Sequence, residues 1–333
     1  MRIFVSGATG SIGAHLVKIL SEQGHTIHIL VRSLEKAENL PFPNVKTFKG
    51  DITDKESIDK AMKGCVQAYH LAAYAKVWAK DSGKFYKINV EGTVKVLQSA
   101  LENRVQKVVV TSTGGVFGPS INEIVTEEKI RDIDFLNEYE GSKTFAELKI
   151  MKFVNEHDLD VVIVSPTRVY GPFIFGAPSS TTLMIDKYIN HSWRIYPGNR
   201  EKLGNYIYIE DAALGHILAM EKGRRGQTYI LGGENYNYVD FYRILGEVSR
   251  VKRKMIEIPV WVQKAVAWGY LLRAEWFGIE PDIAPKWIPK GQYDWAVSSQ
   301  KAIKELGLPV TPLDEGLKKT VAYVQSLLKN QSL

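Results

Sequence analysis

Cysteine and long apolar runs are both scarce in this sequence of 333 residues. The single cysteine, Cys65, excludes an internal disulfide and any multi-cysteine zinc or iron–sulfur site, and it suits a reducing compartment. The longest uncharged stretch, Val169 to Ile185, contains two prolines and two glycines, so it cannot form the uniform apolar helix of about 20 residues that spans a bilayer. The chain also opens on a short strand-like run without the apolar region of a signal peptide. The sequence therefore predicts a cytoplasmic protein without a transmembrane helix.

Patterns typical of metal and nucleic-acid binding are also lacking. Of the seven histidines, only His25 and His28 approach the spacing of metal ligands, and no cysteine or acidic cluster lies near them. The net charge of +6 and the isoelectric point near 9.0 are compatible with an anionic cofactor. The one dense basic run, residues 250–254, is short and has no interleaved aromatic residues, which predicts a solvated loop. We expect no metal site, no nucleic-acid partner and no membrane partner.

The first half of the chain alternates short β-branched runs with longer amphipathic segments. Strands are predicted at Arg2–Ser6, Thr26–Val31, Val45–Phe48, Val66–Leu71, Lys107–Thr111 and Asp160–Ser165. Helices are predicted at Ser11–Gln23, Lys55–Met62, Lys84–Asn103 and Glu138–His157. This alternation predicts an α/β fold of the Rossmann type, a doubly wound parallel sheet with helices on both faces.

The second half is irregular, with proline, glycine and aromatic residues crowding residues 166–200. Beyond that stretch, the patterns predict strands at 206–209 and 228–231 and helices at 211–221, 239–249, 260–274, 298–306 and 313–329. We expect two lobes. Residues 1–166 form the nucleotide-binding Rossmann domain, to which 205–233 return, and residues 167–204 and 234–333 form a smaller, mostly helical substrate lobe.

Three glycines at intervals of three follow the first predicted strand. Gly7, Gly10 and Gly13 lie between that strand and the next helix, where glycine lets the backbone approach a pyrophosphate closely. The N-terminus of the following helix directs free N–H groups at that charge. The position of the glycines between a strand and a helix predicts a dinucleotide site.

A tyrosine and a lysine four residues apart form the candidate acid–base pair. Tyr139 and Lys143 lie on one face of a predicted helix. A free tyrosine titrates near 10, and a neighbouring cation depresses that pKa by about 1–3 units. We therefore expect Lys143 to make Tyr139 a usable proton donor at neutral pH.

These motifs resemble the extended branch of the short-chain dehydrogenase/reductase superfamily, which includes the NAD-dependent epimerases and dehydratases. The residues that carry the resemblance are the Gly-x-x-Gly-x-x-Gly turn and the run Tyr139-Glu140-Gly141-Ser142-Lys143-Thr144-Phe145-Ala146-Glu147. Further segments, such as His70-Leu71-Ala72-Ala73 and Pro166-Thr167-Arg168-Val169-Tyr170-Gly171-Pro172, extend it over nearly the whole chain. Within this branch the chain is most similar to dihydroflavonol 4-reductase-like reductases.

The resemblance implies hydride transfer between a nicotinamide and a small-molecule carbonyl. Tyr139 would protonate the nascent alkoxide, Lys143 would hold the nicotinamide ribose, and Thr113 would orient the carbonyl oxygen. Three hydroxyls end the preceding strand, so Ser112 remains a rival for the role of Thr113. The family usually has serine at this position, and the extra methyl of threonine predicts a stiffer, narrower site.

The end of the second predicted strand bears on the choice between NADP and NAD. An acidic residue there binds the ribose 2′-hydroxyl of NAD, whereas an arginine accommodates the 2′-phosphate of NADP. Here the chain has Val31-Arg32-Ser33, with no carboxylate before Glu35. We favour NADP(H), with Arg32 on the phosphate and Lys36 as a second cation, and NAD(H) stays the alternative.

The resemblance also assigns cofactor contacts along the ends of the predicted strands. Asp51 would contact the adenine, small residues after the fourth strand would let the cofactor pass, and Asn89 would be a structural anchor. The full expected set is Gly7, Thr9, Gly10, Ser11, Ile12, Gly13, Arg32, Lys36, Asp51, Ile52, Leu71, Ala72, Ala73, Asn89, Thr111, Ser112, Tyr139, Lys143, Pro166, Thr167 and Val169.

Aromatic residues near the strand ends predict an apolar substrate pocket. The expected lining residues are Tyr74, Trp78, Thr113, Gly114, Tyr170 and Phe173. Substrate choice would depend on the irregular segments 74–86, 173–204 and 261–294.

Three tryptophans recur in the tail at steps of seven and eight residues. Trp261, Trp268 and Trp276 therefore share one face of a predicted helix. Such a stripe is typical of a face that packs against the rest of the protein, although a lobe that covers an active site can use it for both purposes.

Two other functions remain open. Dehydratases of this branch carry Asp-Glu after the catalytic hydroxyl, where this chain has Gly114-Gly115, and sugar-nucleotide epimerases commonly carry Arg-Asp where it has Gly204-Asn205. The first difference argues against dehydration, and the second weakens epimerisation with tightly bound NAD without excluding it. A non-catalytic dinucleotide sensor would not need the intact triad. The resemblance also implies a homodimer formed through the helices at 84–103 and 138–157.

Overall fold

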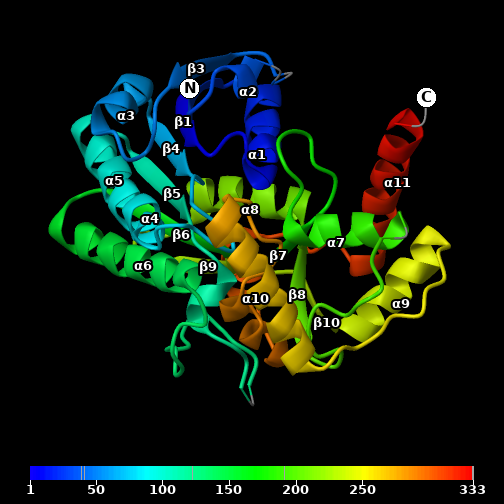
Figure 1. Cartoon of the computed structure of the whole chain (residues 1–333). Coiled ribbons are helices and arrows are strands. Elements are labelled where there is room, and N and C mark those ends of the chain that lie inside the picture. Colours follow the sequence, from blue (N-terminus) through cyan, green and yellow to red (C-terminus); the bar gives the residue numbers. More distant parts are fainter. Residues whose placement is uncertain (39, 41, 122, 191, 332–333) are drawn as a thin grey trace.

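A seven-stranded parallel sheet forms the centre of the larger lobe (Figure 1). The computed structural model describes residues 1–38, 40, 42–121, 123–190 and 192–331. The strand order is β3-β2-β1-β4-β5-β6-β9, which reverses between β2 and β4 on either side of β1. The strands are β1 (Arg2–Ser6), β2 (Thr26–Val31), β3 (Val45–Lys49), β4 (Gln67–His70), β5 (Lys107–Thr111), β6 (Asp160–Pro166) and β9 (Thr228–Leu231). The predicted Rossmann-type fold is confirmed.

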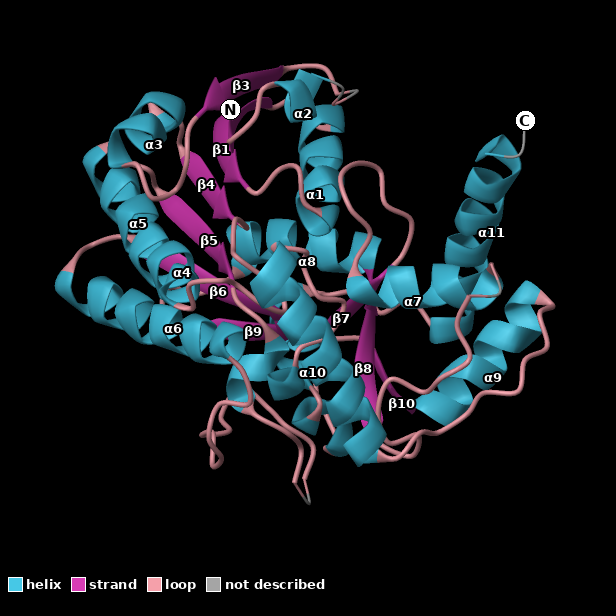
Figure 2. Cartoon of the chain, viewed as in Figure 1, coloured by secondary structure: helices cyan, strands magenta, loops and turns pink. Residues whose placement is uncertain are grey.

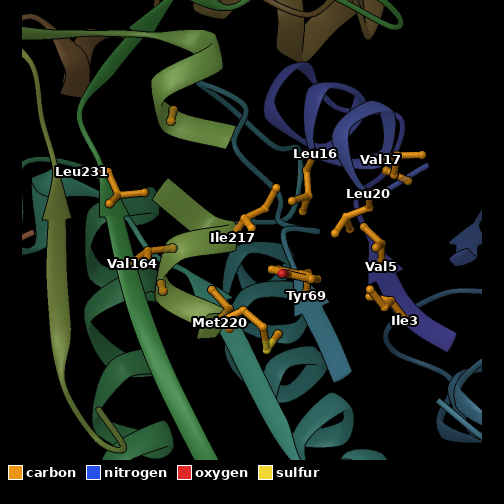
Figure 3. Close-up of a cluster of buried hydrophobic side chains, with 14 of the residues drawn as sticks. Ile3, Val5, Leu16, Val17, Leu20, Tyr69, Val164, Ile217, Met220 and Leu231 are labelled. Atoms are coloured by element: carbon orange, nitrogen blue, oxygen red, sulfur yellow. The ribbon is translucent and has the colours of Figure 1, made fainter. Parts of the chain in front are cut away.

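Helices cover both faces of this sheet (Figure 2). One face carries α1 (Ser11–Glu22) and α8 (Ile209–Lys222), and the other carries α3 (Lys55–Met62), α5 (Gly92–Glu102) and α6 (Glu138–Glu156). Strand residues alternate between the two faces, so Ile3 and Val5 pack under α1 while Phe4 packs under α3 and α5. Figure 3 shows the first of these cores, which consists of Ile3, Val5, Leu16, Val17, Leu20, Tyr69, Val164, Ile217, Met220 and Leu231 together with further residues.

The smaller lobe contains a second sheet that the sequence did not predict. Its order is β10-β8-β7, with β7 (Arg168–Tyr170), β8 (Leu203–Tyr208) and β10 (Glu234–Asn237). Within 205–233, α8 and β9 lie against the main sheet, whereas β8 pairs with β7 and β10. A strand's pattern reports its buried faces and not its hydrogen-bonding partner, which explains the difference.

The remaining helices frame this second sheet and the edge of the first. They are α2 (Glu35–Glu38), α4 (Gly83–Tyr86), α7 (Ser180–Ile189), α9 (Tyr238–Ser249), α10 (Val260–Phe277) and α11 (Leu313–Gln331). Shorter turns are the 3₁₀ segments Gly114–Phe117, Pro285–Trp287 and Pro289–Gln292 and the π-helical segments Lys87–Glu91 and Ala302–Leu306. In the described ranges, no helix has both the length and the apolarity needed to cross a membrane.

The helix predicted over 84–103 is divided by a π-helical turn. The segment Lys87–Glu91 separates α4 from α5 and contains the buried Asn89. A π-bulge inserts an extra residue and redirects the side chains around it, and such bulges are frequent at functional sites.

Candidate functional site

The functional residues gather at the carboxyl edge of the main sheet. Because all seven strands are parallel, the segments that follow them lie along one edge. Gly7 follows β1, Arg32 follows β2 and Leu71 follows β4. The order of the strands reverses at β1, and ligands of open α/β sheets bind beside such a point.

The glycine turn is packed too closely against its own backbone and against Ala72 to carry side chains at Gly7 and Gly13. Gly7 has φ +79°, and a Cβ there would lie 2.6 Å from the Ala72 nitrogen. A Cβ at Gly13 would lie 2.1 Å from the Gly7 oxygen. Gly10 caps α1 without a side-chain hydrogen bond, no acidic residue occupies the first turn of the helix, and Thr9, Ser11 and Ile12 complete the turn. The turn therefore fits a dinucleotide pyrophosphate, since it offers N–H groups and close access to the backbone.

The ends of β2 and β3 carry the residues expected at the adenosine half of a cofactor. Arg32 is exposed directly after β2, and Lys36 lies in α2. Asp51 accepts hydrogen bonds at 2.8 Å from both the backbone N–H and the hydroxyl of Thr53 through one carboxylate oxygen. Ile52 is buried beside α5. Asp51 therefore shapes the local turn and still faces the edge of the site.

Asn89 links the segment after β4 to the helix that carries the candidate acid. Its side-chain oxygen accepts a hydrogen bond from the Tyr74 N–H at 2.7 Å, and its amide nitrogen donates to the Ser142 hydroxyl at 2.9 Å. The segment Leu71–Ala73 is thereby held against the glycine turn. Asn89 is 1% exposed, so the link is a buried one.

Three of the predicted residues lie together where β5 ends. The Thr113 hydroxyl accepts a hydrogen bond from the Gly115 N–H at 3.3 Å and lies near enough to the Tyr139 phenol to lower its pKa. Lys143 follows Tyr139 by one turn of α6 and donates from Nζ to the Thr111 carbonyl oxygen at 2.6 Å. Burial lowers the pKa of the Lys143 ammonium to about 8. The tertiary structure thus brings the end of β5 and the first turns of α6 together.

The pKa of Tyr139 differs from the expectation. Burial raises the pKa of the phenol to about 12, while the nearby Thr113 hydroxyl is the influence that lowers it. The predicted depression by Lys143 is therefore not met in this structure, in which the ammonium is directed at Thr111. A phenol with this pKa keeps its proton throughout the neutral range but is a weaker acid than a free tyrosine.

The other two hydroxyls at the end of β5 have different surroundings. Ser112 is 5% exposed and lies near the Glu147 carboxyl, whose pKa burial raises to about 7, but its hydroxyl has no hydrogen-bond partner among the described residues. The Thr111 hydroxyl is 2.9 Å from Nε2 of His216, which donates from Nδ1 to the Ala212 oxygen. Of the three residues, Thr113 is the one beside the Tyr139 phenol.

Buried charges brace this site, and no pattern along the sequence indicated them. Glu140 is 0% exposed and pairs with Arg131 at 2.9 Å and with Lys290 at 2.8 Å. Arg131 also donates to the Gly115 oxygen at 2.8 Å, just after Thr113. Glu140 falls inside the tyrosine–lysine motif, but nothing in that motif indicates partners 9 and 150 residues away.

A tryptophan of the C-terminal segment covers the candidate acid. The Trp287 ring stacks near the Tyr139 ring, with centroids 6.5 Å apart and planes at 22°. Its indole N–H donates to the Val77 oxygen at 3.0 Å. Trp287 lies in the irregular segment 261–294 that we expected to govern substrate choice, although no motif distinguished it there.

Two of the predicted pocket residues line a hollow beside this cover. Tyr74 and Trp78 border a space of about 370 Å³, together with Lys84, Gly278 and Glu280 among others. The Tyr74 hydroxyl donates to the Trp78 oxygen at 3.0 Å, which fixes this loop. The hollow therefore lies between the segment after β4 and the end of α10.

Two other predicted pocket residues lie elsewhere. Tyr170 is 0% exposed and belongs to the core of the smaller lobe. Phe173 packs edge-on against Tyr323 of α11, with ring centroids 5.3 Å apart. Their place as substrate-lining residues is corrected, because β7 turns its tyrosine into the second core and the following loop runs toward α11.

The segment after β6 completes the edge. Pro166 ends β6, and the Thr167 hydroxyl donates to the Asn205 side chain at 2.8 Å. Gly114 approaches Thr167 so closely that a Cβ there would lie 3.3 Å from its methyl group, while Val169 sits in β7. In the described part of the chain, no group of three or more His, Cys, Asp or Glu side chains could hold a metal ion.

Comparisons with known proteins agree with this geometry. A family model described as "NAD dependent epimerase/dehydratase family" matches residues 3–237. The chain is 28% identical over 329 residues to a putative dihydroflavonol 4-reductase of Synechocystis sp., covering 97% of this chain and 94% of that relative. It is 29% identical over 277 residues to sterol demethylase protein B of Methylococcus capsulatus, covering 80% of each.

Solved structures share the fold. The UDP-glucose 4-epimerase of Thermotoga maritima, solved with UDP-glucose, superposes with a TM-score of 0.82 over 98% of this chain and 100% of that chain. The identity of the two sequences is 22%, so this likeness shows the fold alone.

Proposed function

The chain belongs to the NAD dependent epimerase/dehydratase family of extended short-chain dehydrogenases/reductases, and from this premise we propose that it is an NADP(H)-dependent reductase of aldehydes or ketones. The resemblance to dihydroflavonol 4-reductase-like reductases is confirmed by the relatives. The family and these relatives indicate an oxidoreductase that depends on NAD or NADP. Reduction of a carbonyl with NADPH is the more specific proposal.

The observation that carries the proposal is the contact between Thr113 and Tyr139 beside the glycine turn. A phenol that lies beside a hydroxyl and is protonated at neutral pH is suited to give its proton to a carbonyl oxygen. Lys143 lies one helical turn after Tyr139 and is 3% exposed. It places a positive charge near the phenol. The three groups lie at the same sheet edge as the pyrophosphate cradle.

Each of these three residues then has a role in the reduction. When bound, NADPH supplies the hydride. Thr113 orients the carbonyl oxygen, Tyr139 donates the proton to it, and Lys143 holds the nicotinamide ribose. Trp287 and its anchor on Val77 exclude water from above the phenol.

We infer a substrate with an apolar body from the aromatic residues at the hollow, whose border also carries the charged Lys76, Lys80, Asp81, Lys84 and Glu280. Tyr74 and Trp78 present aromatic surface at its border, and Trp287 covers Tyr139 nearby. Aromatic side chains supply large apolar contact area at small conformational cost. The relatives named for a dihydroflavonol and a sterol are consistent with this substrate class.

We expect Arg32→Ala to remove the preference for NADPH. A charge-assisted hydrogen bond to the 2′-phosphate contributes about 1.5–3 kcal/mol, so NADPH binding should weaken about 10- to 100-fold while NADH binding changes little. Calorimetry with NADPH, NADH and their oxidised forms measures both. Lys18→Ala, which removes an exposed cation of α1, is the matched control and should bind NADPH normally.

Other results would redirect the proposal. Equal NADPH binding by the Arg32→Ala variant and the natural chain would remove Arg32 from the cofactor site. Purification with tightly bound NAD would instead favour sugar-nucleotide epimerisation. Gly204, which stands where epimerases commonly carry a substrate-binding arginine, lies so close to the Arg168 guanidinium that a Cβ there would be 2.3 Å from it.

We also propose a homodimer formed through the outer face of α5 and α6. Phe145, Leu148 and Met151 are exposed on α6, at 45%, 62% and 36%, and Tyr86 adjoins Phe145. Large exposed apolar patches are typical of interaction sites.

A charge on this face tests the dimer. We expect Leu148→Glu to convert a dimer of the natural chain to a monomer in sedimentation analysis, because a carboxylate would be desolvated in the interface. Ile130→Glu, at another exposed apolar position, should leave the dimer intact. A monomeric natural chain would contradict the proposal.

A further inference from the structure

Helix α10 turns a broad apolar face to the outside. Only Ala267 and Ala274 of this helix are buried. The opposite side carries Trp261, Val266, Trp268, Leu272, Trp276 and Phe277, each exposed, with Trp261 at 73%, Trp276 at 75% and Phe277 at 70%. Figure 1 shows α10 on the near side of the molecule, in front of the small sheet.

This face is the reverse of what an ordinary surface helix presents. Surface helices direct an apolar stripe inward and polar residues outward. In α10 a pair of alanines faces inward, and the exposed residues of the helix include three charged ones, Lys264, Arg273 and Glu275, among the apolar ones. The packing face that the tryptophan spacing predicted is therefore uncovered in the described chain.

Basic residues outnumber acidic ones along this helix and the segment before it. Residues 250–277 contain six basic residues and two acidic ones, Glu257 and Glu275. Of the basic ones, Lys252 and Lys254 are exposed just before α10, and Lys264 and Arg273 are exposed on it. A second copy of the chain would set these like charges against each other, whereas an anionic surface complements them.

We propose that α10 docks the protein onto the surface of a lipid bilayer that contains anionic phospholipids. Tryptophan prefers the interface between headgroups and acyl chains, and an amphipathic helix lies in that plane with its apolar face inserted about 5–10 Å. Basic residues beside the inserted face add attraction to anionic headgroups. The sequence analysis predicts no membrane partner, because residue spacing alone does not show that these tryptophans are exposed. Their exposure is decided only in the folded chain.

The docking face ends at the mouth of the substrate hollow. Gly278 and Glu280 follow α10 directly and border the hollow together with Tyr74 and Trp78. The docking face therefore lies next to this hollow. Any use of the hollow by a substrate rests on the proposed function, whereas the docking itself does not.

Sedimentation with vesicles tests the docking without any activity measurement. We expect the full chain to sediment with vesicles of phosphatidylcholine and phosphatidylglycerol, with tryptophan emission shifting to shorter wavelength, and to bind pure phosphatidylcholine more weakly. Trp261→Ser combined with Trp276→Ser should weaken binding at least about tenfold, because two large apolar side chains no longer insert. Both side chains are mostly exposed, so circular dichroism should show an intact fold.

Two further variants complete the experiment. Lys264→Glu combined with Arg273→Glu should reduce binding to the mixed vesicles and its dependence on salt. Ile130→Ser, which removes an apolar side chain exposed at 88% outside this face, should bind like the natural chain. Failure of the natural chain to sediment with the mixed vesicles, or equal sedimentation of the double tryptophan variant, would overturn the proposal. The proposal would also be overturned if the natural chain formed a dimer that the tryptophan substitutions converted to monomers.

Discussion

Replacing Tyr139 by phenylalanine is expected to lower kcat by about 10²–10⁴-fold, the usual contribution of a positioned general acid. The substitution removes one hydroxyl, and that hydroxyl is the atom that Thr113 contacts. The measurement is NADPH consumption with the best substrate from a screen of apolar aldehydes and ketones. The dissociation constant for NADPH should change by less than about twofold, since the ring and its stacking on Trp287 stay in place.

A second tyrosine provides the control for this prediction. Tyr86 is 43% exposed on α4, and Tyr86→Phe also removes one hydroxyl. Its rate should match that of the natural chain. If Tyr139→Phe kept full activity, the proton would come from another group and the proposed chemistry would be wrong. Thr113→Val distinguishes orientation from proton donation, because it leaves the phenol in place and removes the hydroxyl beside it.

Glu140→Gln should destabilise the protein by about 3 kcal/mol or more, which is the usual result of removing one partner of a buried ion pair. Glu140 balances two cations, and its loss leaves Arg131, whose side chain is 8% exposed, and Lys290, at 25%, without their shared carboxylate. Burial already lowers the pKa of Lys290, which shows that its charge is costly in this place. The free energy of unfolding in denaturant measures the effect.

The matched control lies on the same helix. Glu156 is 52% exposed and pairs with Lys152 four residues earlier. Because exposed pairs contribute little, Glu156→Gln should change the free energy of unfolding by less than about 0.5 kcal/mol. Equal stability of the Glu140→Gln and Glu156→Gln variants would contradict the prediction.

The buried cluster also links stability to the geometry of the site. Glu140 directly follows Tyr139, and its partner Arg131 holds the backbone at Gly115, two residues after Thr113. Its other partner, Lys290, lies three residues after Trp287 and over its ring. The Glu140 carboxylate therefore holds three parts of the site in place. They are Tyr139, the segment after Thr113, and Trp287.

Local patterns in the sequence were enough to predict the fold of the larger lobe and the outline of its site. The glycine turn depends on two positions, Gly7 and Gly13, whose Cβ atoms would clash with the backbone, and residues four apart on a helix share a face wherever the helix packs. The alternation of strands and helices similarly dictates a parallel sheet, whose strand ends must lie along one edge. Residues such as Gly13, Tyr139 and Thr113 could therefore be identified from the sequence.

Only the tertiary structure decided the partners across long distances in sequence. Glu140 meets Lys290, β8 pairs with β7 and β10 instead of the main sheet, and Tyr170 enters the second core. The tryptophan stripe of α10 has the period of a buried face, yet the fold leaves it outside. Periodicity records which residues share a face, whereas what that face packs against depends on topology, which residue spacing along the chain does not contain.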